Sequence, residues 1–97
     1  KRGKQCKRIF TNGLTDILVK PLENKELAVC FLNKSNEEKH MVLPVFKLHN
    51  EPYVDLPLAK EYLATELWEN TEETITNSID CNVAPHGVKI FRISVNQ

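Results

Sequence analysis

The chain has 97 residues, 41% of them hydrophobic and 7% aromatic, and its 13 Lys and Arg balance its 13 Asp and Glu. A chain of this length is expected to form one compact domain over residues 1–97, with a core too thin to enclose a deep pocket. Phosphate backbones are held by clustered excess cations, so the neutral balance argues against nucleic acid as a partner.

The first half of the chain is predicted to form short strands. Turn signals recur at short intervals, and segments rich in Ile, Val, Leu, Phe and Thr lie between them, which is the layout of an all-β sandwich or barrel. Segment 16–20 is expected to form a hairpin with segment 27–32 through the turn at 24–25. Segment 27–32 is apolar on both faces, which predicts a central strand covered by the partner sheet on one side and by a loop or neighbouring domain on the other.

The chain opens with a basic stretch. We expect it to be a linker or the edge of a first strand, since terminal segments are often mobile, with a docking patch as the alternative. Its cations are Lys1, Arg2, Lys4, Lys7 and Arg8.

Residues 55–68 allow two interpretations. Asp55 as a cap, Pro57 in a first turn, and Leu63 and Leu67 at helical spacing together predict a helix. The same stretch also alternates in the manner of a half-buried strand that ends at Trp68. The pattern alone leaves both open.

Three features are expected in the last third of the chain. The acidic stretch 66–73 is predicted to be a solvated loop. Segment 78–83 alternates between apolar and polar residues, which predicts a half-exposed strand. The final strand, 88–95, changes its apolar face near Phe91, and a bulge or a bend between layers would explain that change.

No catalytic constellation is visible among the histidines. His40, His49 and His86 lie at no spacing of a known nucleophile or zinc motif, so we expect neither a metal nor a cofactor. Pro85, His86 and Gly87 are predicted to form a structural corner, in which the proline sets the backbone and the glycine supplies a positive φ. No apolar run approaches the roughly 20 residues that cross a bilayer, and we expect no membrane partner.

The acidic residues give little support for catalysis. A glycosidase needs two carboxylates about 5–10 Å apart across a bound sugar. The candidates are Asp16 and Asp55, which lie near segment edges, and Asp80, which lies on the polar face of a strand. No catalytic residue is predicted from them.

Aromatic rings able to stack on a sugar are carried by Tyr53, Tyr62 and Trp68. A carbohydrate-binding face needs two or more such rings exposed on one surface, and a single Trp beside Leu67 is more typical of a core. We single out Tyr62 and Trp68 as candidates for sugar stacking or for contact with another domain.

The three cysteines, Cys6, Cys30 and Cys81, cannot all pair, and none stands at a metal-ligand spacing. Cys30 and Cys81 are expected to behave as small buried hydrophobic residues. Unpaired thiols slightly favour a cytoplasmic location. A glycosylation sequon at 33–35 leaves a secreted protein open, although short sequons also arise by chance.

Three parts of the chain, in order, resemble one known domain. They are 4–8 with the hairpin 16–35, the strand 64–69, and the corner with the last strand, 83–93. The chain thereby resembles the C-terminal β-sandwich domain of the α-galactosidases of glycoside hydrolase family twenty-seven, the melibiase-like enzymes. It departs from that pattern at Leu18, where an aromatic residue is frequent, and at Glu66, where an aspartate is. The most characteristic matching marks are Pro21-Leu22, Leu67-Trp68 and His86-Gly87.

The resemblance implies a fold and a role. The fold is an all-β, antiparallel Greek-key β-sandwich of about eight strands, with a strand rather than a helix at 62–68. In that family the two catalytic aspartates of a retaining mechanism lie on a preceding (β/α)₈ barrel, none of whose motifs occurs here, so no catalytic residue is carried over. No methionine precedes Met41, so we expect a piece of a longer protein.

The implied function is therefore that of a non-catalytic accessory domain. It would pack on and stabilise the catalytic barrel of the same chain, which hydrolyses terminal α-galactosides, and an oligomer interface is a further partner surface to consider. The alternatives are an independent carbohydrate-binding module and a protein-interaction β-sandwich that uses an exposed sheet edge.

Overall fold

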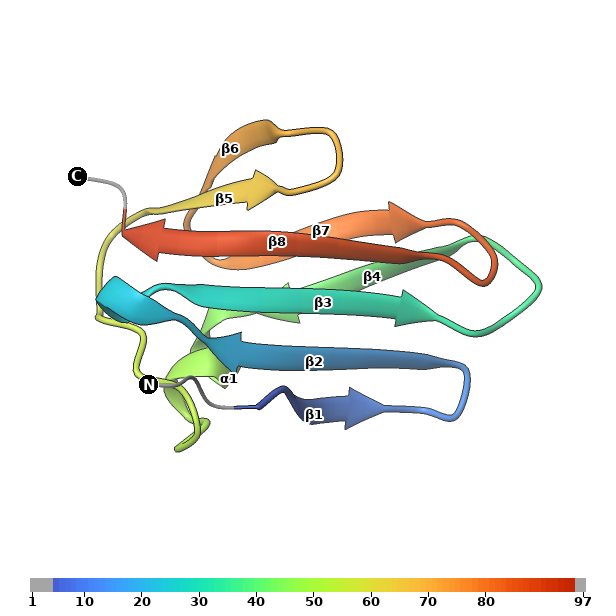
Figure 1. Cartoon of the computed structure of the whole chain (residues 1–97), viewed down its shortest axis with the longest axis horizontal. Helices are drawn as coiled ribbons and strands as arrows, with labels where there is room; N and C mark the ends of the chain where they lie inside the picture. Colours follow the sequence, from blue (N-terminus) through green and yellow to red (C-terminus); the bar gives the residue numbers. More distant parts are fainter. Residues whose placement is uncertain (1–4, 96–97) are drawn as a thin grey trace.

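The computed structural model describes residues 5–95, which fold into two antiparallel β-sheets packed face to face (Figure 1). The larger sheet has the order β1-β2-β3-β8-β5-β6, and the smaller one pairs β4 with β7. The predicted all-β sandwich of eight strands is confirmed. The elements are β1 Lys7–Thr11, β2 Thr15–Pro21, the 3₁₀ turn η1 Glu23–Lys25, β3 Leu27–Asn33, β4 Lys39–Pro44, α1 Val45–His49, β5 Tyr62–Glu66, β6 Thr71–Ile75, β7 Ser78–Val83 and β8 Val88–Val95.

The chain crosses four times between the layers. It leaves the larger sheet after β3 and after β6, to enter β4 and β7, and it returns to the larger sheet at β5 and at β8. These crossings place β3 beside β8 and β4 beside β7, which gives the sandwich its Greek-key connections. The predicted hairpin between β2 and β3 and the central position of β3 are both confirmed.

The core lies between the two sheets. Because side chains alternate along a strand, one face of β2, β3 and β8 points toward β4 and β7, which Figure 1 shows behind the larger sheet. Phe31 and Phe91 meet edge to face there, with ring centroids 5.7 Å apart. The buried side chains of this layer include Ile17, Val19, Val29, Phe31, Met41, Leu43, Ile79, Val83, Phe91 and Ile93.

The change of apolar face in β8 involves no bulge. The pairing of β8 is continuous from Val88 to Ile93 with β3, and from Phe91 to Val95 with β5. Phe91 and Ile93 point into the core, while Val88 and Ile90 point outward and stay exposed. The expected bulge or bend is therefore wrong, because both faces of a regular strand carry apolar residues. A register shift occurs instead in β1, between Arg8 and Phe10.

Within residues 55–68, where the sequence left a helix open, the structure has a short strand and no helix. The strand runs from Tyr62 to Glu66, and residues 54–61 before it form neither helix nor strand. The buried Tyr62 hydroxyl donates to the carbonyl of Pro57 at 2.5 Å and accepts from the N–H of Ala59 at 3.0 Å. These bonds use backbone groups that a helix would need internally, so the segment stays extended.

Two expectations around this strand need correction. The strand ends two residues before Trp68, which lies in the tight turn to β6. The acidic stretch 66–73 is not simply a loop, because Thr71–Ile75 pairs with β5 as an edge strand. The sequence analysis also missed α1, which buries Val45 and Leu48 directly after β4. No helix within residues 5–95 is long and apolar enough to cross a membrane.

Candidate functional site

The outward side of the six-stranded sheet is apolar at its centre. We call this surface the outer apolar face and define it by Leu18, Cys30, Leu32, Val88 and Ile90. Strand pairing places Leu18, Cys30 and Ile90 in one cross-strand row, and Leu32 and Val88 in the next. Val88 is 51% exposed and Ile90 38%, and the other three side chains are half-buried. An antiparallel sheet that faces water usually carries polar residues at such positions.

The turn between β5 and β6 extends this face. The N–H of Leu67 donates to the carbonyl of Ile90 at 2.9 Å. A shallow cavity of about 350 Å³ is lined by residues of the turn together with Val88 and Ile90. The buried carboxylate of Glu66 fixes the turn, because it accepts the N–H of Trp68 at 3.1 Å and that of Glu69 at 2.7 Å. Trp68 lies at the end of the face in this turn, and its side chain is 91% exposed.

A charged cluster borders the other end of the face. Asp16 is 5% exposed, and its Oδ2 lies 3.2 Å from the Lys34 ammonium and 3.8 Å from the Arg8 guanidinium. The Thr11 hydroxyl, followed by Lys34 and Arg8, lowers the pKa of Asp16 against the opposing effect of its burial. Its other oxygen, Oδ1, is buried and makes no hydrogen bond within the described part of the chain.

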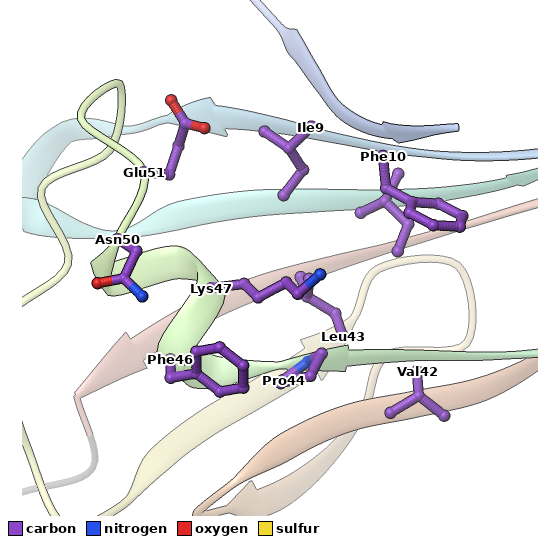
Figure 2. Close-up of a pocket in the computed structure, with 10 residues that line it drawn as sticks. Ile9, Phe10, Val42, Leu43, Pro44, Phe46, Lys47, Asn50 and Glu51 are labelled. Atoms are coloured by element: carbon purple, nitrogen blue, oxygen red, sulfur yellow. The ribbon is translucent and has the colours of Figure 1, made fainter. Parts of the chain in front are cut away.

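A second apolar surface lies at the open edge between the two layers. We call it the edge groove; its volume is about 380 Å³ (Figure 2). Figure 2 shows Ile9 and Phe10 of β1 on one side and Val42, Pro44 and Phe46 on the other. Phe10, Val42 and Phe46 are all exposed.

The groove is also bordered by a carboxylate that already has partners within the chain. Glu51 pairs with Lys7 at 2.7 Å and accepts the N–H of Tyr53 at 3.1 Å. The Lys7 ammonium, with the help of that N–H, lowers the pKa of Glu51. The acid that borders the groove is therefore already satisfied by the chain itself.

The segment 85–87 turns the chain from β7 into β8. The N–H of Gly87 donates to the carbonyl of Ala84 at 2.9 Å, and the N–H of His86 donates to Ser35 at 3.1 Å. The positive φ expected of Gly87 belongs to His86, at 54°. Gly87 is required for a different reason, because a Cβ there would stand 3.0 Å from the Ala84 carbonyl oxygen.

Asn33 holds this corner to β3, and the sequence analysis missed that role. The side chain is fully buried; its Nδ2 donates to the carbonyls of Glu37, Val83 and Ala84 at 2.7, 3.0 and 3.1 Å. Its Oδ1 accepts both the N–H and the hydroxyl of Ser35. The sequon asparagine is therefore a structural residue, with its amide out of reach of a glycan. An Asn that ends an apolar strand two residues before a Ser is the signal that predicts such a turn.

The two aromatic candidates do not lie together. Tyr62 is 1% exposed, and its hydroxyl bonds to Pro57, Ala59 and His49 in the interior. A buried ring offers no surface to a sugar, so the stacking role considered for Tyr62 is wrong. The expected core position of Trp68 is also wrong, because that ring is exposed.

The carboxylate candidates are also separated. Asp16 lies on the outward side of the larger sheet and Asp80 on the exposed side of β7, at the opposite surface of the sandwich, whereas Asp55 lies in the connection before β5. Among the described residues, no group of three His, Cys, Asp or Glu side chains is arranged to hold a metal ion.

The cysteine positions differ from the expected ones. Cys30 and Cys81 are half-buried rather than buried, and Cys6 is exposed. Burial raises the pKa of Cys30, and it raises the pKa of Cys81 to about 11. Both thiols are therefore protonated near neutral pH and make poor nucleophiles.

Comparison with known proteins identifies a family. The family described as the alpha-galactosidase C-terminal beta sandwich domain matches residues 12–93. An α-galactosidase of Schizosaccharomyces pombe is 32% identical over 73 residues, which cover 73% of this chain and 16% of that protein.

Solved structures agree with that match in fold. α-Galactosidase I of Mortierella vinacea superposes with a TM-score of 0.79 at 22% identity, over 94% of this chain and 23% of that one. A family twenty-seven β-L-arabinopyranosidase of Geobacillus stearothermophilus gives 0.82 at 11% identity, over 98% and 20%. The chain thus spans between 16% and 23% of the length of these relatives.

Proposed function

We propose, since this chain belongs to the family of α-galactosidase C-terminal β-sandwich domains, that it packs on and stabilises the catalytic barrel of a longer glycoside hydrolase. The observation that carries the proposal is the match over residues 12–93 to a domain that forms about a fifth of much longer relatives. In this proposal the domain contributes stability, and the chemistry takes place elsewhere in the enzyme.

The proposed chemistry is the retaining hydrolysis of terminal α-galactosides by two carboxylates on the barrel. A retaining mechanism needs two carboxyl groups about 5–5.5 Å apart on either side of the scissile bond. In this chain Asp16 and Asp80 lie on opposite surfaces of the sandwich, which supports the assignment of catalysis to the barrel.

A physical argument supports the stabilising role. Domains within one chain share interfaces of about 600–1,500 Å², and such interfaces bury apolar surface that each domain would otherwise expose. The six-stranded sheet already buries one side against β4 and β7 and still carries apolar side chains on the other. A docked barrel would remove these side chains from water and would gain the same benefit for its own surface.

The test begins with the reading frame that encodes this chain. We expect the full-length protein to contain a (β/α)₈ barrel and to hydrolyse an aryl α-galactoside. Deletion of residues 5–95 is expected to lower its midpoint of thermal inactivation or to make it insoluble, because the barrel would expose apolar surface. A reading frame without a barrel, or a deletion protein as active and as stable as the intact one, would overturn the proposal.

The exposed ring of Trp68 favours one alternative, a carbohydrate-binding module. Tryptophan fluorescence follows this directly, since Trp68 is the single tryptophan of the chain. Titration of the chain with galactosides and with polysaccharides is expected to give no saturable change. A saturable change, together with heat of binding in isothermal titration calorimetry that Trp68→Ala abolishes, would establish the binding module instead.

A further inference from the structure

We infer that the outer apolar face, with Leu67 and Trp68 at its end, is the surface on which the catalytic barrel docks. The inference rests on the proposed function, because that function supplies the occupant. It goes further by choosing one surface of the sandwich and naming the residues that the barrel covers.

The arrangement of the face is the first argument. Its side chains come from three adjacent strands and lie in two neighbouring cross-strand rows, of which one is apolar on all three strands and the other on β3 and β8, so they make one continuous surface rather than scattered exposed residues. Strand β3 at its centre is apolar at every position from Leu27 to Leu32. Such a strand is typical of a sheet that is covered on both sides. Within residues 5–95 only one side of this sheet is covered, by β4, β7 and α1.

The turn at Trp68 is the second argument. Trp is among the residues most enriched at the energetic centres of interfaces, because a rigid ring buries a large area at little entropic cost. Glu66 fixes the backbone of this turn with two hydrogen bonds, and Leu67 is bonded to Ile90 at the margin of the face. The backbone that carries the ring is therefore fixed, and the exposed ring is available for a partner surface to enclose.

Asp16 marks the margin of the face. It lies on the same outward side, directly across from Leu32 of β3 and Thr11 of β1. Its Oδ2 lies 3.2 Å from the Lys34 ammonium and 3.8 Å from the Arg8 guanidinium. Both cations are exposed, and they would form part of the polar rim that surrounds an apolar contact.

The edge groove is the less suitable surface. It is a hollow between two sheet edges rather than a flat face, and Glu51, the acid at its border, is already paired with Lys7 and Tyr53. It does provide a matched control, because Val42 beside it is 49% exposed and Val88 on the outer apolar face is 51% exposed. Because their exposures are so similar, we expect the same substitution at these two valines to perturb the isolated domain about equally, which urea unfolding of the two variants of the domain measures.

The first experiment places Val88→Lys and Val42→Lys separately in the full-length enzyme. An uncompensated charge in an interface is costly, so we expect Val88→Lys to shorten the half-life of activity during heating at least about tenfold. Val42→Lys is expected to leave it unchanged. Equal half-lives, or a larger loss for Val42→Lys, would overturn the choice of face.

A second measurement covers the case in which a lysine variant fails to fold. Val88→Cys and Val42→Cys are small changes, and each new thiol is alkylated in the native full-length enzyme. If the barrel covers the outer apolar face, the thiol at position 88 should be alkylated at least about tenfold more slowly than the thiol at position 42. If neither surface is covered, the two alkylation rates should be similar. Similar rates would overturn the inference while the effect of deleting the domain still stands, so the two proposals fail separately.

Discussion

The six-stranded sheet has two faces built from similar residues in opposite surroundings. On β8, Ile93 points inward and is 0% exposed, while Ile90, three positions earlier, points outward and is 38% exposed. On β3, Phe31 and Val29 are buried, and the adjacent Leu32 and Cys30 are not. At the centre of the sheet both faces are thus apolar, although charged residues such as Asp16 and Arg92 border the outer one, and what differs is whether another part of this chain covers them. The predictions below test that difference from the largest effect to the smallest.

The largest contrast is expected between two identical substitutions on β8. Ile93→Ala should destabilise the folded chain by about 2–5 kcal/mol, because it leaves a cavity in the core between the sheets. Ile90→Ala should cost less than about 1 kcal/mol, because its side chain is already partly in water. Urea unfolding followed by far-ultraviolet circular dichroism measures both, since the exposed Trp68 is a poor fluorescence reporter.

Equal losses of stability for Ile93→Ala and Ile90→Ala would contradict this prediction. They would mean that the outer apolar face is covered in the chain on its own, for example by a second copy. A repeat of the unfolding experiment at several protein concentrations would then show a midpoint that rises with concentration.

The second prediction concerns the polar residue that ends the inner face. Asn33→Ala should cost about 2–3 kcal/mol, because it removes the side-chain partner of the buried Val83 carbonyl and of the buried N–H of Ser35. Asn36→Ala is the control, since Asn36 is exposed and bonds through its side chain to His86. We expect a lower urea midpoint for Asn33→Ala than for Asn36→Ala. Equal midpoints would show that Asn33 does not hold the corner.

Gly87 tests how tightly that corner is closed. Gly87→Ala should destabilise the chain by about 1 kcal/mol, because its Cβ would stand 3.0 Å from the Ala84 carbonyl oxygen in the backbone. Gly13→Ala separates sterics from dihedral strain, since Gly13 has a φ of 91° but open space around it. A thermal midpoint unchanged by Gly87→Ala would show that the turn adjusts freely.

The sequence predicted the fold well where patterns are local. The alternation in 78–83 and the apolar run in 27–32 were enough to place β7 and the central strand β3. The interval between Tyr62 and Trp68 was ambiguous, because the bonds that decide it join the Tyr62 hydroxyl to a segment five residues away, and local propensity does not include them.

The surfaces were harder to predict than the strands. Apolar residues on both sides of 88–95 suggested a bulge, because a pattern cannot tell a covered face from an exposed one. Trp68 was expected in the core for the same reason. The corner at Asn33 involves partners up to 51 residues apart, so its identity as a buried anchor appeared only in the folded chain.

The smallest expected effect is an acid dependence at Asp16, the polar residue of the outward side. The Thr11 hydroxyl, Lys34 and Arg8 hold the pKa of Asp16 below its ordinary value in the folded chain. Its ionised form therefore adds stability above the unfolded pKa of about 4, and this contribution is lost as the pH falls through the folded value. Asp16→Asn should make the decline of the urea midpoint between about pH 5 and pH 2 shallower. The decline should not disappear, because the pKa of Glu51 is also lowered, by Lys7. Parallel curves for the two proteins would show that Asp16 gains nothing from its neighbours. Unlike Asn33, whose side chain bonds to backbone groups in the interior, Asp16 interacts with the exposed cations of Lys34 and Arg8, and screening by solvent keeps its effect smaller.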